Sequence, residues 1–208
     1  EYGVKPTDIK WVISRKDSAA DTSGKVSKQE SMLPDGVDIT MGPIGKDESD
    51  LIEEGLVDAT FHAAEPRGFV EGHPNIVRLF KDSRATEQAF FKKTGIFPIM
   101  HAVAIRRSLV KKHPELPKLA FQAYSQSKTR NYEYMAKLGW AMESLPWFTQ
   151  EFEQTKAVMG ENYYSYGVPA NRKALDSIFR YSHDQGLCSR RLTIEEIFEP
   201  SSLSFEDA

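Results

Sequence analysis

The sequence contains a single cysteine, Cys188, among its 208 residues. That excludes an intrachain disulfide and disfavours a zinc site built from cysteines. No stretch approaches the roughly 18 consecutive apolar residues of a membrane-spanning helix. The 27 Lys and Arg residues nearly balance the 30 Asp and Glu residues, so the basic excess that attracts nucleic acid or an anionic membrane is also missing. Neither nucleic acid nor a membrane is therefore a predicted partner.

Short motifs for metals, phosphates and serine nucleophiles are absent as well. The histidines lie at positions 62, 73, 101, 113 and 183, and none shows the H-E-x-x-H or H-x-H spacing that places two ligands on one face. There is no Gly-rich phosphate loop and no G-x-S-x-G nucleophile elbow. We therefore predict no metal site.

The sequence does have enough apolar side chains for a core, since 40% of its residues are hydrophobic. The first half alternates short β-rich runs with helical stretches, which is typical of an α/β domain with a largely parallel sheet. The predicted strands span residues 9–13, 37–40, 57–61 and 75–80, and the predicted helices span residues 49–55 and 82–93. Residues 14–34 are polar and predict a loop.

From residue 106 onward the pattern becomes helical. An apolar stripe at helical spacing is formed by Leu116, Leu119, Ala120 and Ala123. Further helices are predicted over residues 147–159, from a cap at Asn171 to a stop at Gly186, and after Thr193. The opening stretch EYGVKPTD holds a helix stop signal with no helix before it, so we expect an N-terminal part to precede Glu1.

The run KKTGIFPIMH, residues 92–101, ends on a histidine that is the one titratable group between Gly95 and Ile105. Residues 96–105 are apolar on both alternating faces, which predicts a strand covered on both sides, and Pro98 interrupts its pairing. A buried imidazole needs a hydrogen-bond partner or an opening onto a cleft. Two interpretations of His101 stay open, a core histidine bonded to a backbone carbonyl and a proton donor facing a ligand.

A second candidate group follows the predicted strand 57–61. His62, Glu65 and Arg67 lie within six residues, and in open parallel sheets ligands bind beyond the carboxyl ends of strands. A guanidinium in this place can bind a carboxylate through two hydrogen bonds. The alternative is an ordinary solvated loop in which Arg67 pairs with Glu65 or Glu71.

Several stretches together resemble one family. LIEEGLVDAT, NIVRLF and the long stretch from Thr94 to Tyr124 are similar to the second half of a type 2 periplasmic-binding-protein fold. The more specific combination of TGIFPIMH, SYGVPANR and YSHDQGL resembles the 4,5-dihydroxyphthalate decarboxylase group. The resemblance implies an α/β protein of two lobes with mixed or parallel sheets and a helical C-terminal part. It implies an incomplete α/β lobe over residues 1–95, a crossing strand over residues 96–105 that exposes His101 to the cleft, and a helical part over residues 106–208 that packs on the other lobe.

The resemblance also implies a chemistry, in which a dihydroxylated aromatic carboxylate loses CO2 after protonation of its ring. The ring itself accepts the electrons, so no cofactor is expected. His101 would be the acid, Arg67 the clamp for the remaining carboxylate, and His62 or Glu65 the partner of the phenol. Substrate-binding roles are expected for Thr94, Tyr166 and Asn171.

One alternative is a solute-binding protein that delivers a small aromatic or nitrogenous ligand to a transporter, because the scaffold is shared and fold does not fix function. The decarboxylase is expected in the cytoplasm and the binding protein in the periplasm. The aromatic residues of the second half also allow a homo-oligomer.

Overall fold

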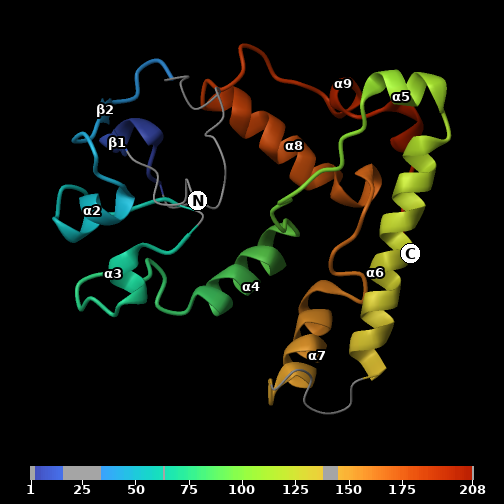
Figure 1. The fold of residues 1–208 in the computed structure, drawn as a ribbon, viewed down its shortest axis with the longest axis horizontal. Helices are drawn as coiled ribbons and strands as arrows, with labels where there is room; N and C mark the ends of the chain where they lie inside the picture. Colours follow the sequence, from blue (N-terminus) through green and yellow to red (C-terminus); the bar gives the residue numbers. More distant parts are fainter. Residues whose placement is uncertain (1–2, 16–33, 63, 138–144, 208) are drawn as a thin grey trace. The chain divides into compact units, whose positions relative to one another are not determined.

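The computed structural model describes residues 3–15, 34–62, 64–137 and 145–207 (Figure 1). The chain divides into two compact units, and each is described by itself. Unit 1 comprises residues 1–81 and 182–189, and unit 2 comprises residues 82–181 and 190–208. Most of the loop predicted over residues 14–34 lies outside the described residues.

Unit 1 contains a two-stranded parallel sheet. Strand β1 (Trp11–Ile13) pairs with β2 (Ile39–Met41) in a register that places Trp11 opposite Ile39. Both lie within two residues of the strands that the sequence predicts, which is the ordinary uncertainty of element ends. The 3-10 helix η1 (Pro6–Asp8) precedes β1, and the short helices α2 (Glu48–Glu53) and α3 (Arg67–Val70) follow β2 and contact each other.

Three other predicted strands are wrong. Residues 57–61, 75–80 and 96–105 are in neither a helix nor a strand. The apolar side chains of these runs are largely exposed, including Phe61 (96%), Leu79 (85%) and Met100 (76%). A short apolar run forms a strand only where a neighbouring strand receives its hydrogen bonds, and among the described residues only β1 and β2 pair as strands. Pro98 further removes a donor from the third run.

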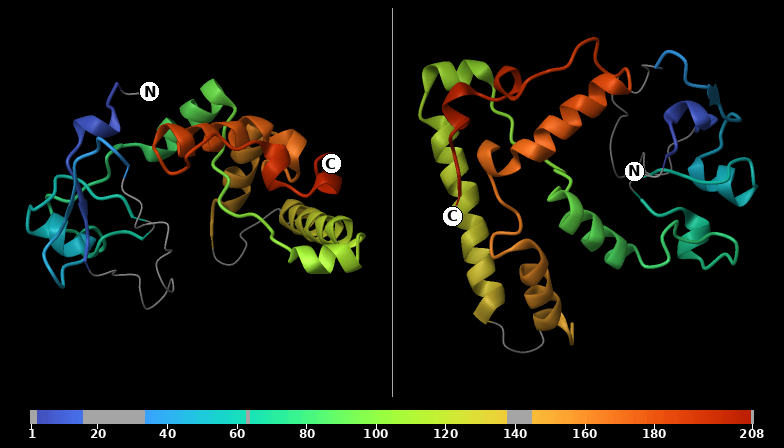
Figure 2. Two further views of the ribbon diagram at one scale, coloured as in Figure 1. Left: turned by 90° about the horizontal axis from the view of Figure 1, so that it is seen from above. Right: turned by 180° about the vertical axis from the view of Figure 1, so that it is seen from behind.

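Unit 2 is helical. Its helices are α4 (Ser83–Thr94), α5 (Arg107–Lys112), α6 (Leu116–Lys137), α7 (Phe148–Met159), α8 (Val168–Asp184, whose last residues belong to unit 1), α9 (Ile194–Ile197) and the 3-10 helix η3 (Pro200–Ser202). Helix η3 packs against the long helix α6, and α5 turns onto its beginning (Figures 1 and 2). Arg84 of α4 bonds Glu151 and Gln154 of α7, which joins these two helices.

Local signals set several of the helix ends. The carboxylate of Asp82 accepts from the Ala85 amide and caps α4, and Gly95 ends the helix at a positive φ of 65°. The cap at Asp82 confirms the prediction, and the helix ends one residue after the predicted end at residue 93. The predicted cap at Asn171 is wrong, because α8 already begins at Val168, where Pro169 is tolerated in the first turn.

The core of unit 2 lies where α8 meets α9. Val168, Leu175 and Ile194 are buried, and Phe179, Phe198 and Leu203 pack against them. The stripe predicted on α6 is only partly right, since Leu119 is 53% exposed, and the inward face of the helix holds instead the buried Pro117 and Lys128 and the half-buried Phe121. The described protein is thus a mixed helix–strand structure with a small parallel sheet. Among the helices of the described part, none combines the length and the apolar character needed to cross a membrane.

Candidate active site

In unit 1, Arg67 begins helix α3 and faces the beginning of α2. Its guanidinium donates to Asp47 Oδ2 at 3.0 Å and to Asp50 Oδ1 at 2.6 Å, and its backbone amide donates to Ser49 Oγ at 3.0 Å. Asp47 is the N-cap of α2 and its side chain is only 2% exposed. The bonds to Asp47, and next those to Asp50, raise the pKa of Arg67. Arg67 therefore holds α3 against the capped end of α2.

The alternative interpretation, in which Arg67 pairs with Glu65 or Glu71, is wrong, and the role of Arg67 as a carboxylate clamp stays a prediction. The carboxylate partners of Arg67 are Asp47, Asp50 and, at 4.0 Å, Glu53, whereas Glu65 pairs with Arg78. The side chain of Arg67 is still 44% exposed, so further N–H groups of the guanidinium can reach a ligand. The surrounding carboxylates oppose the approach of another carboxylate, however, since like charges repel at short range.

His62 lies beside a carboxylate that the sequence did not single out. Its Nδ1 lies 3.1 Å from the Ala64 amide nitrogen and 3.6 Å from Glu48 Oε1. The side chain of Glu48 is 10% exposed and that of His62 is 23% exposed. Nδ1 also lies 3.4 Å from the Ala64 carbonyl oxygen, so whether it donates or accepts depends on the tautomer. His62 and Glu65 are thus near each other in sequence but have different partners.

In unit 2, the residues of TGIFPIMH form an irregular segment after α4. The Thr94 hydroxyl donates to the Phe90 carbonyl at 2.8 Å and accepts from the Ile96 amide at 3.1 Å, which shapes the turn that leaves the helix. His101 is exposed, and its imidazole makes no hydrogen bond or ion pair with another residue of the described part. The interpretation of His101 as a buried core histidine is therefore wrong for this structure.

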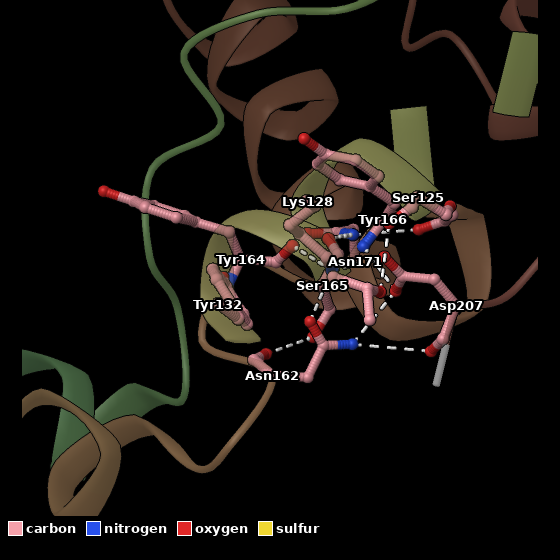
Figure 3. Close-up of polar contacts among 11 residues, drawn as sticks. Ser125, Lys128, Tyr132, Asn162, Tyr164, Ser165, Tyr166, Asn171 and Asp207 are labelled. Atoms are coloured by element: carbon pink, nitrogen blue, oxygen red, sulfur yellow. Dashed lines mark hydrogen bonds and ion pairs between the residues drawn. The ribbon is translucent and has the colours of Figure 1, made fainter. Parts of the chain in front are cut away.

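Tyr166 and Asn171 are brought together by the segment of residues 162–167, which precedes α8. The side-chain amide of Asn171 donates from Nδ2 to the carbonyls of Ser165 at 2.8 Å and Gly167 at 2.9 Å (Figure 3). The Tyr166 amide donates to Asp207 Oδ1 at 2.8 Å, and the Tyr166 ring lies 4.5 Å from Lys128 Nζ. Hydrogen bonds therefore hold both Tyr166 and Asn171 in one part of unit 2.

Sequence reasoning missed Lys128, Asn162 and Asp207, which surround this segment. One signal was available for Lys128. It lies seven residues after Phe121 and four before Tyr132 on α6, a spacing that places it on the helix's buried stripe. A lysine at such a position needs an anionic partner. No comparable signal identifies Asp207, which is 79 residues away in sequence.

The tyrosines nearby are unsuited to act as bases near neutral pH. Burial raises the pKa of Tyr132 and of Tyr163, so both phenols keep their protons. The two rings stack at a centroid distance of 4.5 Å. Their contribution to the site is shape rather than proton transfer.

The carboxylates and histidines do not form a metal centre in the part of the chain that the structure describes. No group of three or more His, Cys, Asp or Glu side chains there is arranged to hold a metal ion.

The described architecture is that of a mixed helix–strand protein, and its candidate site residues are of acid–base type. Comparison with known proteins gives a more specific relation. A 4,5-dihydroxyphthalate decarboxylase of Comamonas testosteroni is 31% identical over 203 residues, which cover 98% of this chain and 60% of that protein. A 4,5-dihydroxyphthalate decarboxylase of Pseudomonas putida is 24% identical over 92 residues, covering 44% of this chain and 34% of that protein.

The first of these similarities supports membership of the chain in the 4,5-dihydroxyphthalate decarboxylase family. No family model matches the chain. The chain spans less than two thirds of the length of the curated relatives that it matches.

Proposed function

We propose that the protein is a carboxy-lyase that converts 4,5-dihydroxyphthalate to 3,4-dihydroxybenzoate and CO2. The observation that carries this proposal is the 31% identity along 98% of the chain to a protein named for that activity. The alternative, a transporter's solute-binding protein, is not favoured, because both relatives described above carry the decarboxylase name.

The proposed reaction follows from the ring chemistry of the substrate. One ring hydroxyl is para to the carboxylate that leaves, and its deprotonation raises the electron density on the carbon that carries this carboxylate. A proton donated to that carbon forms a C–H bond and leaves a dienone. The C–C bond to the carboxylate then breaks, CO2 departs, and its electron pair restores the aromatic ring. The phenoxide regains its proton, so each turnover consumes one proton in total.

In this proposal His101 donates the proton to the ring carbon. Its exposure, and its lack of a partner among the described residues, support this role because a donor must be able to reach the ligand. His62 or Glu65 accepts the phenol proton, and Arg67 binds the carboxylate that remains. Thr94, Tyr166 and Asn171 contribute to substrate binding. For Arg67, the bonds to Asp47 and Asp50 support a structural role at least as well.

We also propose that the chain has the type 2 periplasmic-binding-protein scaffold, with an incomplete α/β lobe over residues 1–95, a crossing segment over residues 96–105 and a helical part over residues 106–208. The parallel pairing of β1 with β2 is compatible with such a scaffold. The substrate, a small aromatic carboxylate, is the partner that this proposal requires.

The proposal is tested by incubating the purified protein with 4,5-dihydroxyphthalate and measuring CO2 release and 3,4-dihydroxybenzoate. Phthalate is the matched control, because without hydroxyls its ring is not activated for protonation. A panel of dihydroxybenzoates shows whether another hydroxylated acid is preferred. If no member of the panel releases CO2 above the rate without protein, the proposed function is wrong.

The role of His101 is tested by His101→Ala, which should lower kcat by about 10²- to 10⁴-fold, the usual contribution of a general acid. His113→Ala is the matched control, since His113 is also exposed in unit 2 and lies beside Glu115. Equal rates for the two variants would remove His101 from the mechanism.

A further inference from the structure

Lys128 and Asp207 form an ion pair inside unit 2. Their side chains are only 6% and 3% exposed, respectively. Two charges withdrawn from water in this way require nearly complete hydrogen bonding, because the desolvation of each ion is otherwise uncompensated. The hydrogen bonds of this pair therefore identify the segment of the chain that the pair holds in place.

The bonds of the pair converge on the segment of residues 162–167. Lys128 Nζ donates to Asn162 Oδ1 and, at 2.9 Å, to the Tyr164 carbonyl (Figure 3). Asp207 Oδ1 accepts from Asn162 Nδ2 at 3.0 Å and from the Tyr166 amide at 2.8 Å. The segment thus gives an amide side chain, a carbonyl and a backbone N–H to one buried pair. We name Lys128, Asn162, Tyr166 and Asp207 the Lys128 cluster.

Packing contacts that do not involve the ion pair also hold the chain around Asp207 in place. The Phe205 ring packs on the Phe121 ring of α6 at a centroid distance of 5.2 Å. Gly167 has a φ of +99°, and a Cβ added there would lie 3.0 Å from the Phe205 carbonyl carbon and closer still to its oxygen. Residues 205–207 therefore pass directly over Gly167, where a side chain would displace them.

The segment that the cluster holds contacts Asn171 and the TGIFPIMH segment. Asn171 donates to the Ser165 and Gly167 carbonyls, as described above. The Tyr164 ring meets the Phe97 ring edge-on at 5.7 Å, and Phe97 lies four residues before His101. The segment held by the Lys128 cluster thus touches the TGIFPIMH segment through the Tyr164–Phe97 ring pair.

We propose that Lys128 and Asp207 are a positioning pair that fixes residues 162–167, and with them Tyr166 and Asn171, in the arrangement that substrate binding uses. Neither residue touches the substrate in this inference. Its catalytic half rests on the proposed function, whereas its structural half does not.

The structural half is tested by hydrogen exchange on the protein with Lys128→Met and, separately, with Asp207→Asn. The backbone amides of Tyr164 and Tyr166, which donate to the Tyr132 hydroxyl and to Asp207 Oδ1, should exchange about tenfold faster or more in both variants, because the segment opens more readily without the ion pair. Lys156→Met is the matched control, since Lys156 also has acidic partners and lies 5.2 Å from the Phe152 ring, but its ion pairs with Glu153 and Glu161 are at the surface. Unchanged exchange at Tyr164 and Tyr166 would overturn the inference.

A steric variant keeps the test decisive if a charge substitution prevents folding. Gly167→Ala leaves every charge in place but displaces residues 205–207, so it should accelerate exchange in the same amides. Exchange at the rate of the unsubstituted protein would mean that the packing of residues 205–207 over Gly167 does not hold residues 162–167 in place.

The catalytic half is tested by steady-state kinetics with 4,5-dihydroxyphthalate. Asp207→Asn should raise KM by about tenfold with a smaller change in kcat, because small displacements of binding groups weaken substrate positioning. His101→Ala should instead lower kcat. Faster exchange with unchanged KM would remove the catalytic half alone. If the unsubstituted protein releases no CO2, the proposed function fails, and exchange still decides the structural half.

Discussion

At the scale of single residues, Arg67 shows how a charged side chain can serve structure and ligand binding in conflicting ways. Its bonds to Asp47 and Asp50 hold α3 against the N-terminal end of α2. The negative charges of the acidic residues there also interact favourably with the positive end of the helix dipole. A substrate carboxylate would compete with these partners for the same guanidinium. The two roles predict different consequences of its removal.

We expect Arg67→Ala to lower the free energy of unfolding by about 1 kcal/mol, a value kept small because solvent screens a half-exposed ion pair. The loss arises because the carboxylate of Asp47, only 2% exposed, loses its cationic partner. Urea unfolding measures the effect. Arg78→Ala is the control, because its pair with Glu65 is exposed on both sides and should contribute less. A raised KM with unchanged stability would instead favour the carboxylate clamp.

Tyr132 gives a residue-scale prediction about alkaline pH. Burial raises the pKa of its phenol, so the folded state holds the proton more tightly than the unfolded state does. The resulting stability is present below the ordinary tyrosine pKa of about 10 and is lost as pH rises beyond it. Phenolate absorbance should therefore show Tyr132 ionising only with unfolding, and Tyr132→Phe should reduce the loss of stability above about pH 10. The same titration in denaturant is the control, and equal phenolate counts in both would contradict the prediction.

At the scale of elements, the ends of helices were easier to predict than the strands. Asp82 and Gly95 act through backbone groups within a few residues, so α4 follows from local sequence. Thr193 likewise begins α9 through a capping box with Glu196. Strands depend on partners that lie far away in sequence, which is why apolar runs at 57–61 and 75–80 were misleading.

Residues of the candidate site could likewise be singled out where the signal was local, but their distant partners could not be predicted. His101 and Arg67 were singled out from residue type and neighbouring pattern, and their roles stay predictions. The Asp47 and Asp50 partners of Arg67 lie 20 and 17 residues away in sequence, and the Asp207 partner of Lys128 lies 79 residues away. Such pairs are created by the packing of helices, and no local spacing encodes them.

Helix α9 supplies a prediction about acid. Hydrogen bonds from Arg190, and next from the Thr193 amide, lower the pKa of Glu196 to about 2. Because the folded pKa lies below the ordinary value of about 4.3, this contribution to stability is present above that value and is lost as pH falls toward 2. Glu196→Gln should therefore flatten the decline of stability over that range, measured by urea unfolding at a series of pH values. Arg190→Met should flatten it similarly; an unchanged decline in both variants would show that this bond network does not contribute.

At the scale of the whole molecule, the proposed chemistry needs only a proton donor, a phenol acceptor and binding groups, all of which ordinary side chains provide. The net charge of −3 is small, so the field of the whole protein offers no strong attraction to a dicarboxylate substrate. Recognition must therefore come from local groups. The described local groups include the half-exposed Arg67 and the segment held by the Lys128 cluster.

The proposed reaction makes a prediction about the origin of one hydrogen atom in the product. The acid that protonates the ring exchanges its proton with solvent, so turnover in D2O should place a single deuterium on the carbon that lost CO2. That carbon is ortho to the retained carboxylate and para to the meta hydroxyl of 3,4-dihydroxybenzoate. Proton NMR of the product measures the loss of that one signal. Unlabelled 3,4-dihydroxybenzoate incubated with the protein in D2O controls for exchange after release. A product without deuterium at that carbon would rule out protonation by a solvent-exchanging acid, and with it the role assigned to His101.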